Sequence, residues 1–142
     1  LCYTIDSFSS AHRDTGYFGI YTALGRPTEM QALELIGQEV RAFAQEGPTE
    51  EEVRRSVEQL KSSALMSLES MNSRMNANAR GEFLYGHPLS AEDIIRGYDA
   101  VTRDGVHQLA QELFKLPNAS FSAVGKVSSQ EEYQAVIRAA LC

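Results

Sequence analysis

The sequence has 142 residues, of which 43% are hydrophobic and 23% are charged, the composition of an ordinary globular protein with enough chain for one hydrophobic core. Thirteen basic against nineteen acidic residues give a net charge of −6, which disfavours nucleic acids and anionic membranes as partners. No apolar run approaches the roughly 20 residues of a membrane-spanning helix and no signal-peptide pattern is present, so the sequence predicts a cytoplasmic location.

Two segments with strand periodicity begin the chain and predict an antiparallel β-hairpin. Residues 1–8 alternate with period two, which places Tyr3 and Ile5 on one face and Cys2 on the other. Residues 17–24 form the second predicted strand, and a polar connection lies between the two.

Helices follow the hairpin, and three capping boxes predict where they begin: Thr28 with Gln31, Thr49 with Glu52, and Ser90 with Asp93. Gly47 and the proline after it predict the end of the first helix. The second helix has a long apolar stripe that includes Met71 and Met75, for which we predict packing in the core. Asparagines at residues 72–78 predict a break or kink in this helix.

A later strand is predicted at residues 119–124, before a final helix. The fold class is therefore α+β: an antiparallel or mixed β-sheet, made of the hairpin plus the later strand and covered by helices on one face, in a single domain over residues 1–142. Three strands make a thin sheet and Leu1 already lies within a strand. We therefore expect a domain truncated at its N-terminus, with further strands supplied by sequence before Leu1.

Residues with catalytic or metal-binding chemistry are scattered. None of His12, His87 and His107 has a second histidine three or four residues away, the spacing that puts two ligands on one helix face. The sequence contains no G-x-S-x-G nucleophile elbow and no phosphate-binding loop. For Cys2 and Cys142 we predict free thiols in a reducing compartment, and a disulfide between them requires that the two ends of the chain meet.

Five segments together resemble one known family: LCYTI at residues 1–5, DTGYFGIY at 14–21, PTEEEV at 48–53, SLESMNSRM at 67–75 and VTRDGV at 101–106. In this order they are similar to segments of the pitrilysin-type zinc metallopeptidases, the insulinase and mitochondrial-processing-peptidase family. The resemblance covers nearly the whole chain. It implies the processing-peptidase-like metallohydrolase fold.

The resemblance implies that the intact protein hydrolyses peptides with zinc, and that this chain is the later part of its non-catalytic C-terminal domain. In that family a first domain carries the zinc motif H-x-x-E-H, and a partner domain of the same fold closes the chamber and contacts the peptide substrate. This sequence has no H-x-x-E-H. The resemblance therefore implies that this chain alone has no cofactor and no activity, and that zinc lies on a sister domain or subunit.

The resemblance also implies a substrate-binding role for Tyr3. The family's partner domain holds substrate near the zinc with an arginine and a tyrosine seven residues apart. Tyr3 matches the tyrosine, whereas the arginine would precede Leu1. A phenol there can donate a hydrogen bond to a substrate carbonyl or to the oxyanion formed on attack. From the residues alone, packing in the sheet is the better explanation of Tyr3.

Two other functions stay open from the sequence. The first is a catalytically inactive peptide-binding or scaffold homologue of the same family, whose other half has also lost its metal ligands. The second does not depend on the resemblance: it is the function of a small α+β interaction domain that folds by itself.

Overall fold

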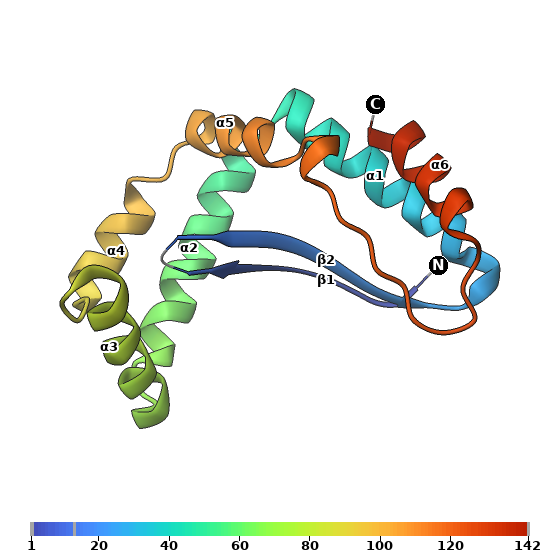
Figure 1. Cartoon of the computed structure of the whole chain (residues 1–142). Helices are drawn as coiled ribbons and strands as arrows, with labels where there is room; N and C mark the ends of the chain where they lie inside the picture. The colour runs from blue at the N-terminus through green and yellow to red at the C-terminus, as the bar shows by residue number, and fades with distance from the viewer. Residues whose placement is uncertain (1, 13, 142) are drawn as a thin grey trace. The chain divides into compact units, whose positions relative to one another are not determined.

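The computed structural model describes residues 2–12 and 14–141 (Figure 1). The chain forms two compact units: the first contains residues 1–11, 15–47 and 107–142, and the second contains residues 12–14 and 48–106. The α+β fold class is confirmed, since helices accompany an antiparallel sheet. The single domain over residues 1–142 stays a prediction.

The predicted hairpin is confirmed in the first unit, where β1 (Cys2–Ala11) pairs antiparallel with β2 (Gly16–Leu24) (Figure 1). Leu1, the first residue of the predicted strand, lies outside the described residues. The strand β1 continues beyond residue 8 because residues 9–11 pair with residues 16–18 through the backbone. Such ladder hydrogen bonds do not require apolar side chains.

A bulge at Tyr3 changes the predicted faces of β1. Cys2 pairs with Leu24 and Thr4 pairs with Ala23, so Tyr3 has no partner in the register. One extra residue shifts the alternation by one position. Cys2 therefore shares a face with Ile5, and the prediction that these two side chains lie on opposite faces is wrong.

The helical part of the first unit consists mainly of α1 (Glu29–Glu46) and α6 (Gln130–Leu141), which lie side by side (Figure 1). Small residues allow this close packing: Gly37 and Ala140 are buried, and a Cβ on Gly37 would lie 2.4 Å from the Cβ of Ala140. The short 3-10 helix η1 (Arg26–Thr28) connects β2 to α1.

Aromatic rings and one polar cluster connect the elements of the first unit. The ring centroids of Phe114 and of Phe18 on β2 are 5.2 Å apart. Glu29 at the start of α1 accepts hydrogen bonds from Ser128 Oγ at 2.6 Å and from the hydroxyl of Tyr133 at 3.2 Å. The same hydroxyl accepts the backbone N–H of Ser128 at 3.1 Å, so the segment that enters α6 is fixed to α1.

The predicted strand at residues 119–124 does not form, which corrects the predicted sheet. In the described part of the chain the sheet contains β1 and β2 alone. The segment leaves the 3-10 helix η2 (Leu116–Asn118) through Ala119 in an extended conformation, but its backbone pairs with no described strand. Alternating residues favour an extended chain, whereas a sheet also requires a neighbouring strand edge.

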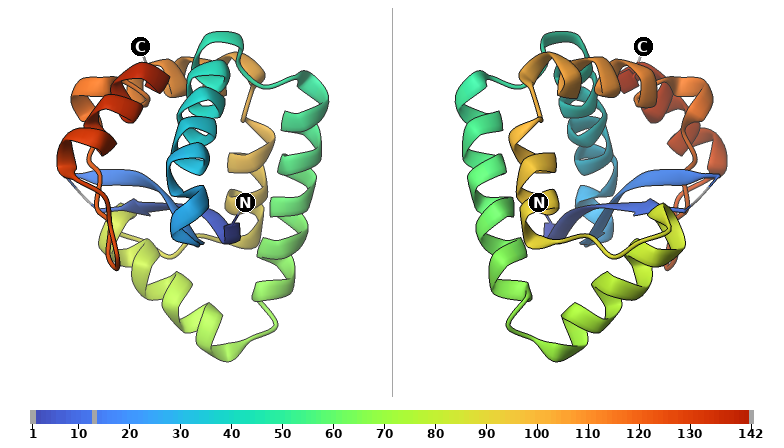
Figure 2. Two further views of the ribbon diagram at one scale, coloured as in Figure 1. Left: turned by 90° about the vertical axis from the view of Figure 1, so that its right-hand side faces the viewer. Right: turned by 90° about the vertical axis from the view of Figure 1, so that its left-hand side faces the viewer.

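The second unit contains α2 (Glu50–Ser67), α3 (Met71–Tyr85) and α4 (Ala91–Asp99), and α4 lies beside α2 in both views of Figure 2. Lys61 Nζ on α2 lies 2.7 Å from a carboxylate oxygen of Asp99. The helix α5 (Arg103–Leu113) begins in this unit and ends in the first. Among the described residues, every helix is too short or too polar to cross a lipid bilayer.

Two of the three predicted capping boxes are confirmed, at Thr49 with Glu52 and at Ser90 with Asp93. The box predicted at Thr28 is wrong: Thr28 lies in η1, and its hydroxyl donates to the carbonyl of Gly25 at 3.0 Å. The tighter 3-10 turn before α1 uses the hydroxyl that a capping box would need.

The break in the predicted long helix lies earlier than expected. The helix α2 ends at Ser67, and α3 begins at Met71 with Ser70 as its N-cap. Ser70 Oγ accepts the backbone N–H of Ser73 and so favours a new helix start at this place. Met71 and Met75 are 80% and 60% exposed, and the prediction that they pack in the core is wrong.

Candidate functional site

Tyr3, the one residue to which the resemblance gives a site role, lies at the bulge of β1. Its side chain is 87% exposed. Its hydroxyl makes no hydrogen bond to another residue in the described part of the chain. A bulged residue leaves the regular pleat and can present its side chain away from the ladder. The structure therefore contradicts packing of Tyr3 in the sheet.

The backbone next to Tyr3 is held by two hydrogen bonds. The hydroxyl of Thr22 on β2 donates to the carbonyl of Thr4 at 2.9 Å, across the hairpin. The hydroxyl of Thr4 donates to a carboxylate oxygen of Asp6 at 3.0 Å. These contacts fix the strand immediately after the bulge, while the phenol itself stays accessible.

An aromatic row occupies the face of the hairpin that bears Thr4. The register places Phe8, Tyr17 and Tyr21 on this face. The rings of Phe8 and Tyr17 meet edge to face at 6.0 Å between centroids, and all three side chains are exposed. Phe8 covers Gly19, where an added Cβ would lie 2.6 Å from the ring. Period-two alternation in both strands is the sequence signal for this row, but only the pairing shows that the rings lie together.

The opposite face of the hairpin forms an apolar cleft with α1. The cleft has a volume of about 240 Å³ and is lined by Cys2, Ile5, Ile20 and Thr22 of the hairpin and by Ala32, Leu35, Ile36, Glu39 and Val40 of α1. Cys2 is a free, exposed cysteine, as the sequence predicts, whereas Cys142 lies outside the described residues. The lining is mostly apolar, as in an incompletely filled core.

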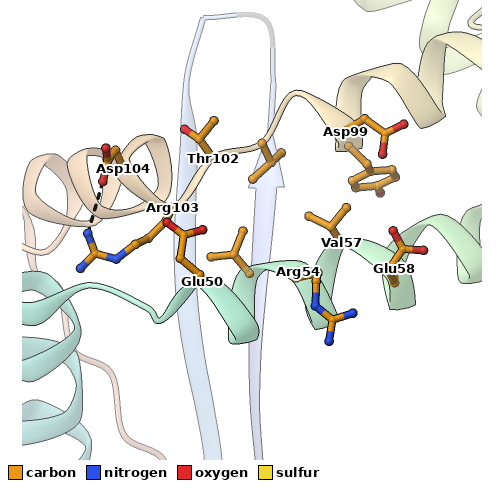
Figure 3. Close-up of a pocket in the computed structure, with 11 residues that line it drawn as sticks. Glu50, Arg54, Val57, Glu58, Asp99, Thr102, Arg103 and Asp104 are labelled. Atoms are coloured by element: carbon orange, nitrogen blue, oxygen red, sulfur yellow. Dashed lines mark hydrogen bonds and ion pairs between the residues drawn. The ribbon is translucent and has the colours of Figure 1, made fainter.

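A second cleft, of about 390 Å³, lies within the second unit (Figure 3). Its lining comes from α2, α4 and the start of α5: Glu50, Val53, Arg54, Val57, Glu58, Tyr98, Asp99, Val101, Thr102, Arg103 and Asp104. Figure 3 shows the ion pair between Arg103 and Asp104, whose charged atoms are 3.2 Å apart. Arg103 Nε also donates to the carbonyl of Pro48 at 2.8 Å. The polar groups of this cleft thus stabilise the junction of three helices.

Several carboxylates in the first turns of helices have a lowered pKa, and Glu52 and Asp93 are the two that belong to capping boxes. Hydrogen bonds from the backbone N–H and the hydroxyl of Thr49 lower the pKa of Glu52 below its ordinary value. The hydroxyl and the backbone N–H of Ser90 likewise lower the pKa of Asp93. Both carboxylates serve as helix caps, so these pKa shifts report local helix structure rather than a reaction centre.

The described histidines do not form a metal site. His107 Nε2 lies 3.1 Å from the carbonyl oxygen of Ala44, and His87 Nδ1 lies 3.1 Å from the carbonyl oxygen of Pro88. Within residues 2–12 and 14–141, no group of three or more histidine, cysteine, aspartate or glutamate residues is arranged to hold a metal ion. The donor set of these residues does not fit a zinc ion.

Comparison with known proteins agrees with the resemblance seen in the sequence. A family model described as the peptidase M16 inactive domain matches residues 1–60. An uncharacterized zinc protease of Bacillus subtilis, YmxG, is 35% identical over 114 residues, which are 80% of this chain and 28% of that protein. The chain belongs to the M16 peptidase family. The pitrilysin-type resemblance is thereby confirmed.

Two further M16 relatives match over nearly the whole chain. An uncharacterized zinc protease of Streptomyces coelicolor is 29% identical over 132 residues, which cover 92% of this chain and 28% of the relative. The beta subunit of the mitochondrial-processing peptidase of Blastocladiella emersonii is 30% identical over 136 residues, which cover 96% of this chain and 29% of the relative. The chain therefore spans less than a third of the length of these M16 relatives.

Proposed function

We propose that this chain is the non-metal-binding domain of a zinc metallopeptidase that hydrolyses peptides, and that it closes the substrate chamber and contacts the peptide through Tyr3. The names of the relatives support a zinc protease, and the match to the inactive domain supports a role without metal. The observation that carries the proposal is the accessible phenol of Tyr3 on a bulge.

The chemistry of Tyr3 follows from its free hydroxyl. A sister domain that holds zinc would supply a metal-activated water for attack on the peptide bond. The phenol of Tyr3 would donate a hydrogen bond to the substrate carbonyl or to the oxyanion that develops on it. One such donor, held in place before the reaction, contributes on the order of 10²–10³ to the rate.

A sister M16 domain or subunit is the second part of the proposal. The relative from Blastocladiella emersonii is named as a subunit of a peptidase, which is consistent with pairing between related chains. The described residues do not fit zinc. The proposal places zinc and its ligands on that sister, on the same polypeptide or on a separate one. The cytoplasmic location stays a prediction.

Replacement of Tyr3 tests the substrate role in the complete, zinc-loaded peptidase. In Tyr3→Phe we expect kcat to fall on the order of 10²–10³-fold if the phenol stabilises the oxyanion. A rise in KM at unchanged kcat would instead assign it to uniform substrate binding. Tyr17→Phe is the matched control, because Tyr17 is another exposed tyrosine of the same hairpin. Equal kcat and KM in Tyr3→Phe and the unmodified enzyme would exclude the role.

The metal assignment has its own test. Elemental analysis of the purified 142-residue chain is expected to find no stoichiometric zinc. One tightly bound zinc per chain would refute the proposal that zinc is held by a sister domain or subunit. The coding sequence next to this segment separates peptidase from scaffold: an intact H-x-x-E-H motif supports hydrolysis, and its loss supports an inactive peptide-binding homologue.

A further inference from the structure

The helix α3 bears a row of exposed side chains. Met71, Met75, Ala79 and Phe83 follow one another at intervals of four residues. Met71, Met75 and Phe83 are 80%, 60% and 84% exposed, and Ala79 is exposed as well. Successive members are rotated by only about 40° around the helix axis, so they form one continuous ridge. Ridges of this kind pack into the grooves of other helices.

The charges of α3 are reversed relative to its own dipole. A helix favours acidic side chains near its N-terminus and basic ones near its C-terminus. The helices α4 and α6 follow this rule at both ends, and α2 begins with three glutamates. In α3, Arg74 lies among the first four residues and Glu82 among the last four. Both side chains are exposed, and neither forms an ion pair with another described residue.

The reversed charges are favourable in one arrangement, an antiparallel pair of α3 helices. In that pair Arg74 meets the negative end of the second helix and Glu82 of the second copy, and Glu82 meets the positive end and Arg74 of the second copy. The two charges lie eight residues apart in one helix, too far for a pair within it. Both are within about 60° of a residue of the ridge, so they would flank the apolar contact.

The apolar ridge is also complementary to itself in the antiparallel arrangement. Its midpoint lies between Met75 and Ala79, so the long side chain of Met75 meets the small Ala79 of the second copy. Phe83 approaches Met71 of the second copy, and sulfur–aromatic contacts of this kind are favourable. The sizes of the ridge side chains and the positions of the two charges therefore both favour a second copy of α3 in antiparallel orientation.

We propose that the exposed ridge of α3 (Met71, Met75, Ala79 and Phe83) is a self-association surface that binds the α3 of a second copy of this chain in antiparallel orientation. One helix pair buries less than the roughly 800 Å² per partner of a standard stable interface. The dimer is therefore weak, concentration-dependent and sensitive to salt, since exposed charge pairs are screened. It is independent of the function proposed for Tyr3.

Charge exchange tests the proposal with the full 142-residue chain in sedimentation equilibrium, at low salt and with reductant to keep Cys2 reduced. The unmodified chain is expected to dimerise as its concentration rises. Arg74→Glu or Glu82→Arg alone should weaken dimerisation by about 10-fold, since two symmetry-related pairs become repulsive. The double variant Arg74→Glu with Glu82→Arg should dimerise more strongly than either single variant, because its side-chain pairs are again opposite in charge, and less strongly than the unmodified chain, because each charge now faces a like-signed helix end. Arg80→Glu is the control, because Arg80 lies about 60° from Phe83 on the edge of the ridge opposite to Arg74 and Glu82.

Thermal unfolding separates an interface from a structural role. Each single exchange improves the match of α3 to its own dipole, so Tm measured on dilute monomer should stay equal or rise while dimerisation weakens. Met75→Lys should abolish dimerisation without lowering that Tm, because a charge on the ridge cannot be buried between two helices. A monomer at every concentration, a double variant that dimerises no more strongly than either single variant, or a lower monomer Tm in Met75→Lys would overturn the proposal. The last result would mean that the same chain covers the ridge.

Discussion

The contact between Gly37 and Ala140 predicts that one added methyl group separates α1 from α6. In Gly37→Ala the new Cβ would lie 2.4 Å from the Cβ of Ala140, whereas carbon atoms in contact stay about 3.5–4.0 Å apart. The helices must move apart by about 1 Å, and overpacking of this kind costs roughly 1–3 kcal/mol. Alanine favours the helix by about 1 kcal/mol over glycine, which offsets part of that cost. The net expectation is a destabilisation of about 1 kcal/mol.

The same substitution at Gly97 is the matched control. A Cβ on Gly97, in α4, meets no atom within 4 Å apart from its chain neighbours and the backbone of its own helix. Gly97→Ala should therefore stabilise the chain by about 0.5–1 kcal/mol through helix propensity. Urea unfolding followed by circular dichroism measures both variants against the unmodified chain. Equal stabilisation by Gly37→Ala and Gly97→Ala would refute the close packing of α1 and α6.

Two further predictions concern polar contacts. Tyr133→Phe removes a hydroxyl that donates to Glu29 and accepts the backbone N–H of Ser128, so urea unfolding should show a loss of about 1 kcal/mol, and an unchanged midpoint would contradict these hydrogen bonds. Glu52 and Asp93 have lowered pKa values in the folded chain, so their contribution to stability is present at neutral pH and is lost as the pH falls through those lowered values. The variant with Glu52→Gln and Asp93→Asn should therefore lose less Tm between about pH 6 and pH 3 than the unmodified chain, and parallel losses would argue against the two caps.

Rules that involve only residues close together in the sequence correctly predicted the local structures that depend on those residues. The capping boxes at Thr49 and Ser90 form as predicted, since each needs only a hydroxyl and a carboxylate three residues later. The hairpin likewise follows from two alternating segments with a short connection. The resemblance to the M16 family was readable for a related reason, because it consists of short strings in a fixed order.

Longer-range features did not follow from the sequence. The stripe that includes Met71 and Met75 has helical periodicity, but periodicity does not show whether another element covers it, and both side chains are exposed. The segment at residues 119–124 has strand periodicity without a strand edge beside it. The bulge at Tyr3 depends on how two strands pair, which no residue of β1 encodes by itself.

The sequence by itself determined the hairpin and most helix starts, because each depends on residue types at short, fixed spacings, and its resemblance to the family indicated Tyr3 as the candidate site residue. Tertiary structure alone decided that Tyr3 leaves the pleat, that Gly37 lies against Ala140, and that α3 leaves an apolar ridge exposed. These features depend on which surfaces meet in space, and burial is a property of the pair of surfaces rather than of either one.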